Sequence, residues 1–389
     1  MDSVPRVAFF TDTYSEINGV ALTSRQLTGF AQSRDYPFLC IRGASADAVS
    51  QSGNTTHVEL RRGRLSFNLD KDLFHDPLLW RHTPAVAAQL RRFRPDIIHV
   101  VSPGDVSEIG VFLAKRLRIP LAISWHTNLH EFAAMRLTKV LSGSWRVVPR
   151  LTQTGILEAM IAFYRLGNVL FAPNEELVQM LQERARRPVF LMKRGIDTTL
   201  FQPARRTLSD GLLRVGYVGR ITPEKNVRIL RDLEIGLQRA CVPPFRFLIV
   251  GDGSERAWLQ ANLASAELPG ILRGSQLAEA CANMDVFVFP SRTDTFGNVV
   301  LEAFASGVPA VVSNAGGPKF IVTPGVNGFV ASTPDDFIEL TTTLLTDAAL
   351  RARMGSAARD YASTQSWDCV FEQVYQGYRT GIAAFQSAV

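Results

Sequence analysis

The feature that most restricts the fold of this chain is a repeated alternation of short apolar runs and amphipathic segments. Runs such as Val7–Thr11 and Ile97–Val101 are rich in β-branched and aromatic residues, as buried strands are. Segments with helical periodicity separate them, for example residues 21–31 and 85–94. A strand that follows such a crossover helix pairs in parallel. The sequence therefore predicts an α/β protein in which helices cover both faces of parallel sheets.

The alternation occurs in both halves of the chain, which indicates two doubly wound, Rossmann-like domains. At 389 residues the chain is also too long for one ordinary core. We predict an N-terminal domain over residues 1–203, a polar, turn-rich linker over 204–212 and a C-terminal domain over 213–366. Residues 367–389 are expected to form a helix that packs back on the N-terminal domain. The strands predicted in the C-terminal domain are 213–218, 245–250, 271–273, 286–289, 310–313 and 328–330.

The composition is that of a soluble globular protein. Hydrophobic residues make up 46% of the chain and charged residues 20%. No apolar run reaches the ~20 residues that span a bilayer, and the N-terminus has no signal-peptide pattern. The four cysteines are scattered without the spacing of metal ligands. These features predict a protein of the reducing cytoplasm.

Positive charge is concentrated in the first half of the chain. Residues 1–200 carry 25 Lys and Arg against 18 Asp and Glu, a net charge of +7 within a total of +6. Such a half attracts an anionic membrane, a nucleic acid or an acidic substrate, and a solvated face explains it equally well. The basic clusters lack the interleaved aromatic residues of nucleic-acid platforms. We therefore expect no nucleic-acid partner.

The stretch from Phe289 to Glu302 combines two carboxylates with the start of a helix. Asp294 lies in the loop after a predicted strand, and Glu302 lies about one turn into a predicted helix over residues 298–306. Gly297 lets the backbone approach a ligand, and the N–H groups of the first helical turn favour an anion. This combination suits a ligand that carries both phosphate and hydroxyl groups.

Further strand ends of the second domain carry similar chemistry. Gly219, with Arg220 and Lys225 behind it, forms a diphosphate cradle of backbone N–H groups and two cations, or simply a loop with two solvated cations. Gly253 follows the next strand, without the spacing of a dinucleotide-binding motif. The carboxyl ends of parallel strands lie along one edge of a sheet. We therefore expect these groups to converge there.

Two residues of the first domain also follow predicted strands. Gly19 lies in the turn after the first strand, and His126 lies just beyond the strand 121–125. Taken alone, Gly19 is explained by a turn that needs a positive φ, and His126 by a satisfied structural histidine. Their position at the edge where ligands bind open sheets favours a functional role.

Taken together, these motifs resemble those of the retaining glycosyltransferases of family 4, which have the GT-B fold of two Rossmann-like domains facing across a cleft. The resemblance spans nearly the whole chain, and the wording around Asp294 is most similar to bacterial GDP-mannose-dependent α-mannosyltransferases and related lipid glycosyltransferases. The matching pieces are Asn18-Gly19-Val20, Ser124-Trp-His126-Thr, the run from Arg194 to Pro203, Gly219-Arg220 with Lys225-Asn226, Val250-Gly-Asp-Gly253, Asp294 with Glu302, Ala305-Ser-Gly-Val-Pro309 and Gly316-Gly317-Pro318.

The resemblance implies a role for each candidate residue. The catalytic set is His126 at the donor sugar, Arg220 and Lys225 at the diphosphate, and Asp294 at the sugar hydroxyls. Glu302 holds the ribose, and the base lies near Arg273, Gly274 and Leu277. The remaining donor contacts are expected from Asn18, Gly19, Gly253, Thr295, Phe296, Gly297 and Asn298.

The implied reaction transfers a hexose, of the mannose or glucose type, from a nucleotide-diphosphate sugar to a hydroxyl acceptor. No metal or other cofactor is expected, because arginine and lysine supply the positive charge. The basic first half fits a lipid-linked acceptor and a peripheral place on the inner face of the plasma membrane. The alternatives are a nucleotide-sugar 2-epimerase with the same fold and a binding protein without transfer activity. At the first acidic position the family usually has Glu, so Asp294 bears on the choice of donor.

Overall fold

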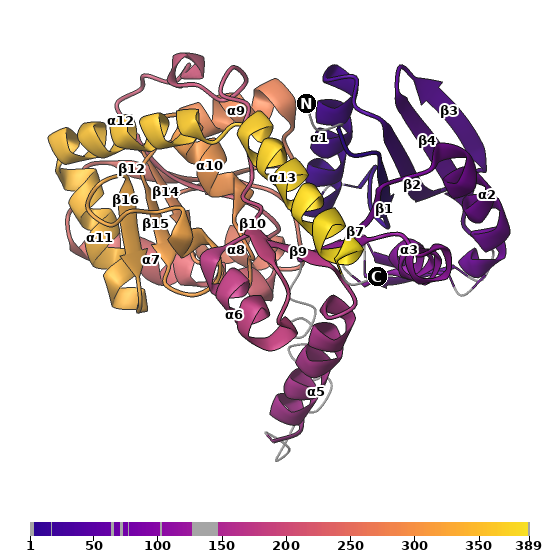
Figure 1. Cartoon of the computed structure of the whole chain (residues 1–389). Helices are drawn as coiled ribbons and strands as arrows, with labels where there is room; N and C mark the ends of the chain where they lie inside the picture. Colours follow the sequence, from indigo (N-terminus) through magenta and orange to yellow (C-terminus); the bar gives the residue numbers. More distant parts are fainter. Residues whose placement is uncertain are drawn as a thin grey trace. The chain divides into compact units, whose positions relative to one another are not determined.

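The computed structural model describes residues 4–387 except residues 17, 64–65, 71–72, 77, 102 and 127–146. It divides into two compact units, which are treated separately. The first comprises Met1–Lys193 and Trp367–Val389, and the second comprises Arg194–Ser366 (Figure 1). Each unit contains its own parallel sheet and its own helices.

The first unit is built on a sheet in the order β10-β9-β8-β7-β1-β2-β4-β3. All neighbouring strands pair in parallel except β3, which runs antiparallel to β4. The strands are β1 (Val7–Thr11), β2 (Phe38–Ala44), β3 (Ala48–Ser52), β4 (Thr55–Arg61), β7 (Ile97–Val101), β8 (Leu121–Ser124), β9 (Val169–Ala172) and β10 (Val189–Leu191). The helices are α1 (Gly19–Ser33), α2 (Thr83–Phe93), α3 (Asp105–Leu117), α5 (Val147–Tyr164), α6 (Glu175–Ala185) and α13 (Trp367–Gln386). A short hairpin of β5 (Phe67–Asp70) and β6 (Leu73–His75) and the 3₁₀ turn η1 (Leu79–His82) complete the unit.

The second unit has a parallel sheet in the order β13-β12-β11-β14-β15-β16. Its strands are β11 (Leu213–Val218), β12 (Phe245–Val250), β13 (Ala266–Gly270), β14 (Val286–Phe289), β15 (Ala310–Ser313) and β16 (Gly328–Ala331). Its helices are α7 (Ile229–Arg239), α8 (Arg256–Asn262), α9 (Gly274–Ala282), α10 (Asn298–Ala305), α11 (Pro334–Thr346) and α12 (Ala348–Thr364), with 3₁₀ turns η2 (Pro203–Arg205), η3 (Pro223–Lys225) and η4 (Pro318–Phe320). The predicted architecture of two doubly wound, Rossmann-like domains is confirmed.

One predicted strand was misplaced. Residues 271–273 were expected to form a strand, but the strand is β13, which ends at Gly270. Its sequence, Ala-Glu-Leu-Pro-Gly, lacks β-branched residues and contains a proline. An edge strand tolerates both features because only one of its sides is paired. Ile271 lies beyond the strand and is exposed.

The boundary between the units lies at Lys193 and Arg194 rather than at residue 203. Phe201 explains the difference, because its side chain is buried in the core of the second unit. The Arg359 guanidinium on α12 also donates hydrogen bonds to the carbonyl oxygens of Phe201 at 2.8 Å and Thr198 at 3.1 Å. Residues 194–203 are thus part of the second unit.

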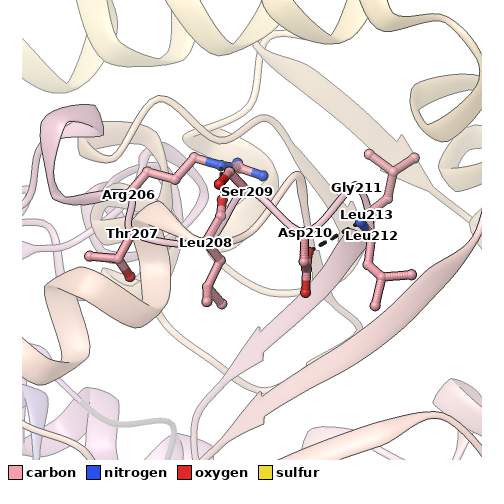
Figure 2. A pocket seen from close by; sticks show the side chains of 8 residues that line it. All are labelled: Arg206, Thr207, Leu208, Ser209, Asp210, Gly211, Leu212 and Leu213. Carbon is pink, nitrogen blue, oxygen red and sulfur yellow. Dashed lines mark hydrogen bonds between the residues drawn. The ribbon is translucent and has the colours of Figure 1, made fainter.

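The predicted linker, residues 204–212, is also fixed to the second unit. The backbone N–H groups of Thr207 and Leu208 both donate to the Asn283 side chain at 2.9 Å. Arg206 forms an ion pair of 3.0 Å with Asp285. The segment from Arg206 to Leu213 lines a pocket of its own (Figure 2). Its polar residues form these contacts rather than a solvated hinge.

Helix α13 returns to the first unit and completes one side of its core. Phe371, Tyr375 and Tyr378 are fully buried in a cluster that also contains Phe9 and Phe171 of the sheet. In Figure 1 this yellow helix lies with the indigo and purple elements of the first unit. Each such buried aromatic side chain contributes roughly 1.5–3 kcal/mol.

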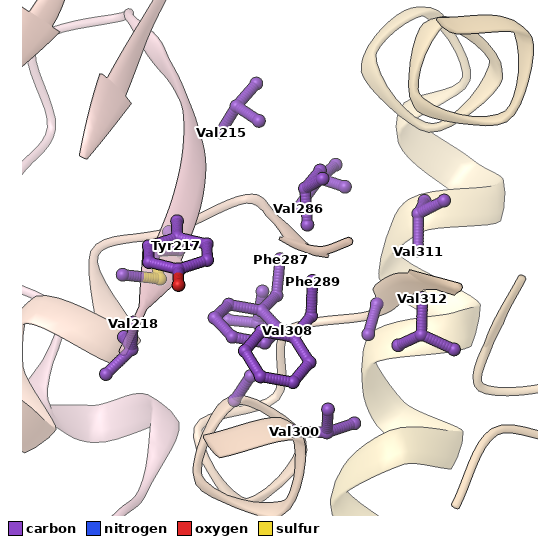
Figure 3. Packing of buried hydrophobic residues seen from close by; sticks show 14 of the residues in the cluster. Val215, Tyr217, Val218, Val286, Phe287, Phe289, Val300, Val308, Val311 and Val312 are labelled. Carbon is purple, nitrogen blue, oxygen red and sulfur yellow. The ribbon is translucent and has the colours of Figure 1, made fainter. Parts of the chain in front are cut away.

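The core of the second unit fixes the strand ends that matter for the site. The strand β14 is buried along its whole length, and its Phe289 ring stacks at 6.0 Å on Tyr217 of β11 and at 5.9 Å on Phe287 (Figure 3). Rings held on two neighbouring strands leave little freedom for either strand to shift. The loops that leave β11 and β14 therefore start from rigid positions.

Candidate active site

The loops after β11 and β12 pack backbone against backbone at the carboxyl edge of the second sheet. The N–H of Gly219 donates to the carbonyl of Val250 at 3.0 Å, and the N–H of Ile221 donates to that of Asp252 at 2.9 Å. Gly253 has a φ of +159°, and a Cβ there would lie 2.2 Å from the carbonyl oxygen of Ile221. Gly253 was expected to contact the donor, and the packing of these two loops by itself requires glycine at this position.

Lys225 and Asp294 are paired with each other, although the resemblance assigns the first to the diphosphate and the second to the sugar of the nucleotide sugar. The Lys225 ammonium donates to both oxygens of Asp294 at 2.7 Å. Lys225 comes from η3 and is buried, whereas Asp294 lies in the loop after β14. Burial alone would raise the pKa of Asp294, but Lys225, with help from Arg220, holds that pKa below its ordinary value. The carboxylate of Asp294 is therefore charged at neutral pH.

Arg220 presents a second positive charge beside this pair. Its side chain is 47% exposed and lies 3.8 Å from the Glu224 carboxylate, which is a weak contact. The Tyr217 hydroxyl donates to the backbone carbonyl of Arg220 at 2.8 Å and so fixes the start of this loop. The arrangement holds the backbone of Arg220 while its guanidinium reaches solvent.

The carboxyl group of Glu302 is in a different environment from that of Asp294. Its Oε2 atom, on α10, is buried and has no hydrogen-bond partner among the described residues. Burial raises the pKa of this carboxyl to about 7. Buried polar atoms are nearly always hydrogen-bonded, because desolvating them without a partner is costly. A buried acceptor of this kind calls for hydroxyl donors from a bound molecule.

Hydroxyl groups on the loops after β11 and β14 share this property, and Ser291 Oγ is one of them. Thr222 Oγ1, in the loop after β11, and Thr293 Oγ1, in the loop after β14, are buried and without a partner among the described residues. The strands β11 and β14 are direct neighbours in the sheet. Polar groups in need of partners thus occur on the same two loops that carry Arg220, Lys225 and Asp294.

The start of α10 has the backbone geometry that the sequence predicts. Gly297 is the N-cap residue with a φ of +100°, which favours glycine. Phe296 beside it points into the hydrophobic core, so its side chain supports the loop. The loop carrying Thr295 is in turn covered by a glycine turn, since the N–H of Gly317 donates to the Asp294 carbonyl at 2.6 Å. Asn298 opens the helix, with its N–H among those of the first turn.

The residues expected near a nucleotide base lie one strand further along the same edge. Arg273 is the exposed N-cap residue of α9, and Gly274 has a φ of +51°. Leu277 is half-buried and packs against the core. They follow β13, which pairs with β12. The structure thus brings them to the edge that carries the loops of β11, β12 and β14.

In the first unit, the structure gives Asn18 a local role. Its side-chain oxygen accepts a hydrogen bond of 2.8 Å from the N–H of Ala21 and so caps α1. A cap of this kind stabilises a helix by about 1 kcal/mol. Gly19 is the exposed first residue of α1. Asn18 therefore has a role in stabilising the helix, whereas Gly19 is exposed at its start.

His126 lies at the end of β8 and is buried. Its Nε2 atom is 2.8 Å from the Ser124 hydroxyl. Ser124 is in turn 3.0 Å from Nε2 of His99 on β7, and Nδ1 of His99 is 2.7 Å from the Tyr378 hydroxyl on α13. Sequence reasoning missed Ser124, His99 and Tyr378 as partners of His126. A polar residue inside an otherwise apolar strand, such as His99 within Ile97–Val101, was the signal that could have found them.

Two features are absent from the described part of the chain. No group of three or more His, Cys, Asp or Glu side chains there is arranged to hold a metal ion. None of the helices described is long and apolar enough to cross a membrane.

Comparison with known proteins gives matches along most of the chain. The sequence model of "Glycosyltransferase Family 4" matches residues 17–200, and that of "Glycosyl transferases group 1" matches residues 201–361. The GDP-mannose-dependent alpha-mannosyltransferase of Mycolicibacterium smegmatis is 33% identical over 76% of each chain. The enzyme of the same name from Corynebacterium glutamicum is 29% identical over 98% of this chain and 90% of that protein. Among solved structures, sucrose-phosphate synthase of Thermosynechococcus elongatus has a TM-score of 0.75 at 19% identity, over 97% of this chain and 99% of its own.

Proposed function

Because this chain belongs to glycosyltransferase family 4 and has the GT-B fold, we propose that it transfers a hexose, with retention, from a nucleoside-diphosphate sugar to a hydroxyl acceptor. GDP-mannose is the proposed donor, since the relatives from M. smegmatis and C. glutamicum carry that dependence in their names. The single observation that carries the proposal is the buried Oε2 of Glu302, which has no partner among the described residues. It lies on α10, the helix that follows the loop of Asp294, the carboxylate bound to Lys225.

We propose that Glu302 holds the ribose of the donor. A ribose offers two neighbouring hydroxyl donors, and a carboxylate accepts from both. Hydrogen bonds from the ligand favour the charged form of the carboxyl and so lower its raised pKa. The buried oxygen then gains the partners that it lacks in the protein alone.

We propose that the diphosphate binds between Arg220 and the N–H groups of the first turn of α10, which opens at Asn298. When the bond to the anomeric carbon breaks, negative charge grows on the diphosphate, and fixed cations stabilise that charge. Lys225 supplies the second cation while Asp294 holds its ammonium in place. This pairing gives Asp294 a second role besides its proposed contact with the sugar hydroxyls. With two cations present, we propose that the reaction needs no metal.

His126 is proposed to contact the transferred sugar. The buried hydrogen bond between the Ser124 hydroxyl and Nε2 of His126 fixes that side of the imidazole. No side chain among the described candidates is proposed as a covalent nucleophile. In a retaining transfer of this type, the leaving phosphate is positioned to take the proton of the acceptor hydroxyl.

A lipid-linked acceptor is the finer part of the proposal. It is supported by the net charge of +7 over residues 1–200, which attracts anionic headgroups. Co-sedimentation with vesicles of phosphatidylglycerol and phosphatidylcholine tests it. Binding that is strong at low salt and lost at high salt is expected, and no binding at low salt would contradict a membrane-bound acceptor.

The test of the donor is a panel of nucleotide sugars offered to the purified enzyme. We expect GDP-mannose to give the largest thermal shift and to be hydrolysed or transferred, and Arg220→Ala to reduce turnover by about 100-fold or more. A preference for a UDP-hexose would correct the donor while keeping the reaction class. Near-normal turnover by Arg220→Ala would overturn the assignment of the site.

A further inference from the structure

A line of four buried polar side chains runs through the apolar core of the first unit. It starts at His126, passes through Ser124 and His99, and ends at Tyr378 on the C-terminal helix. We propose that Ser124, His99 and Tyr378 are positioning residues that hold His126 in the Nδ1–H tautomer for sugar transfer. The inference rests on the proposed function, in that it assumes that His126 contacts the sugar.

The geometry of the line is that of three consecutive hydrogen bonds. The heavy-atom distances are 2.8 Å from His126 to Ser124, 3.0 Å from Ser124 to His99, and 2.7 Å from His99 to Tyr378. All lie within the normal range for strong contacts. The bonds join three elements, because His99 is on β7, Ser124 is on the neighbouring strand β8 and Tyr378 is on α13. The line therefore holds only when α13 is docked on the sheet.

The surroundings of the line keep it dry. Ser124, His99 and Tyr378 have no exposed surface. The His99 ring packs edge-on against Phe9, with 5.2 Å between the centroids, and lies 5.5 Å from Phe171. Polar groups buried among aromatic rings need one another as partners, so replacing one member leaves its neighbour unsatisfied.

His99 must be neutral in this setting, since burial lowers its pKa to about 3. A neutral imidazole donates from one nitrogen and accepts at the other. The hydroxyl of Ser124 can donate in one direction and accept from the other. The hydrogen bonds of the line are therefore consistent in only two orders. Either every donor points from Tyr378 toward His126, or every donor points from His126 toward Tyr378.

The Tyr378 end decides between these orders. Among the described residues, its hydroxyl makes a hydrogen bond only to His99. A buried O–H proton without an acceptor is rarer and costlier than an oxygen lone pair without a donor. Tyr378 therefore donates to Nδ1 of His99. Nε2–H of His99 then donates to Ser124, whose hydroxyl donates to Nε2 of His126.

This order has a direct consequence for the proposed chemistry. Because Nε2 of His126 accepts from Ser124, the proton of the neutral ring lies on Nδ1. The N–H donor of His126 is then on Nδ1, the ring nitrogen that does not bond to Ser124, and an N–H group is the kind of donor that suits an oxygen of the sugar. The ring is also held against rotation, and misplacing a reacting group by about 1 Å can cost up to about 100-fold in rate.

The test compares Tyr378→Phe with Tyr375→Phe. Both tyrosines are buried on α13, but the Tyr375 hydroxyl has no hydrogen-bond partner among the described residues, so Tyr375→Phe is a matched control. In the wild type, ¹⁵N NMR of the imidazole groups should show His126 as the Nδ1–H tautomer. Tyr378→Phe should give a mixed tautomer and a kcat lower by roughly 10- to 100-fold with little change in donor KM. Tyr375→Phe should change neither.

Ser124→Ala provides the second variant, because alanine fits the space of serine and removes the link next to His126. It should reproduce the mixed tautomer and the loss of kcat. In an enzyme that already carries His126→Ala, adding Ser124→Ala or Tyr378→Phe should not lower kcat further. If His126→Ala transfers sugar normally, the proposed role of His126 itself fails. If His126→Ala is inactive while Tyr378→Phe and Ser124→Ala keep the wild-type kcat and tautomer, only the present inference is overturned.

Discussion

At the scale of single residues, the candidate site depends on charges that the fold has placed in unlike environments. Lys225 is buried and bound to Asp294, whereas Arg220 is nearly half exposed. Glu302 is buried with an oxygen that lacks a partner among the described residues. Lys225 and Asp294 neutralise each other within the protein, whereas we propose that Glu302 gains its partners from the bound donor. We therefore expect substitutions of these charged residues to differ in their effects on activity and stability.

The two cations should separate activity from stability. We expect Arg220→Ala to lose about 100-fold or more in turnover while its free energy of unfolding changes by less than about 0.5 kcal/mol. Lys225→Ala should lose activity and also roughly 3 kcal/mol of stability, because it leaves Asp294 without its partner. Urea unfolding beside initial rates checks both. The double variant Lys225→Ala/Asp294→Asn should recover part of the lost stability, and equal losses for single and double variants would contradict the pairing.

Glu302 predicts a dependence of stability on pH in the enzyme without ligand. Its pKa is 4.5 in the reference state and about 7 in the folded protein. Between these values the native state binds more protons than the unfolded state, so this contribution is present below about pH 4.5 and is lost as pH rises through 7. Glu302→Gln should therefore match the wild type near pH 4 and exceed its stability by up to about 3 kcal/mol near pH 8. A difference that stays constant over this range would show that Glu302 is not buried as described.

At the scale of elements, the loops of the second unit are shaped by one another before any ligand binds. The loops after β11 and β12 approach so closely that Gly251 and Gly253 have no room for a side chain. Gly316 and Gly317 cover the loop after β14 in the same way. The edge of this sheet is therefore a preorganised set of backbone groups.

Gly253→Ala tests this preorganisation. A Cβ would lie 2.2 Å from the Ile221 carbonyl and would force a φ of +159° on alanine. We expect a loss of about 1–3 kcal/mol in the free energy of unfolding and weaker nucleotide binding. Gly29→Ala is the control, since a Cβ there meets nothing within 4 Å, and alanine in a helix stabilises by about 0.5–1 kcal/mol. An unchanged stability of Gly253→Ala would show that the loops can separate freely.

Helix α13 is the element that ties the end of the chain to the first unit. Phe371 is fully buried against Phe30, with 5.6 Å between the ring centroids. We expect Phe371→Ala to destabilise the protein by about 3–5 kcal/mol, as measured by urea unfolding. Phe112→Ala serves as the comparison, because its side chain is 45% exposed, and its effect should stay below about 1 kcal/mol. Similar effects of the two substitutions would contradict the packing of α13.

At the scale of the whole molecule, the sequence predicts elements far better than it predicts their partners. The strand β14, with the run Val-Phe-Val-Phe, is recognisable because full burial selects β-branched and aromatic residues at every position. The edge strand β13 is not recognisable, because one unpaired side lets it contain Pro269 and Gly270. The local sequence pattern is therefore enough to recognise a strand only where the strand is fully buried.

The contacts within the candidate site join residues that are distant in the chain. Lys225 and Asp294 are 69 positions apart, and His99 and Tyr378 are 279 positions apart. Motifs at strand ends predicted the edge where the site residues gather. They could not predict that Lys225 binds Asp294, because that contact depends on how two loops pack in three dimensions.

The central claim is that the second unit binds a nucleoside-diphosphate sugar through Glu302 and the cations beside it. Calorimetric titration of the whole protein with GDP-mannose tests it most directly. The proteins compared are the wild type, Glu302→Ala and Glu339→Ala, the last being a control because Glu339 is an exposed glutamate on α11. We predict saturable binding by the wild type and the control, and at least about 10-fold weaker binding by Glu302→Ala, which loses hydrogen bonds to a charged group. Equal affinity of Glu302→Ala and the wild type, or no binding of any nucleotide sugar, would contradict the claim.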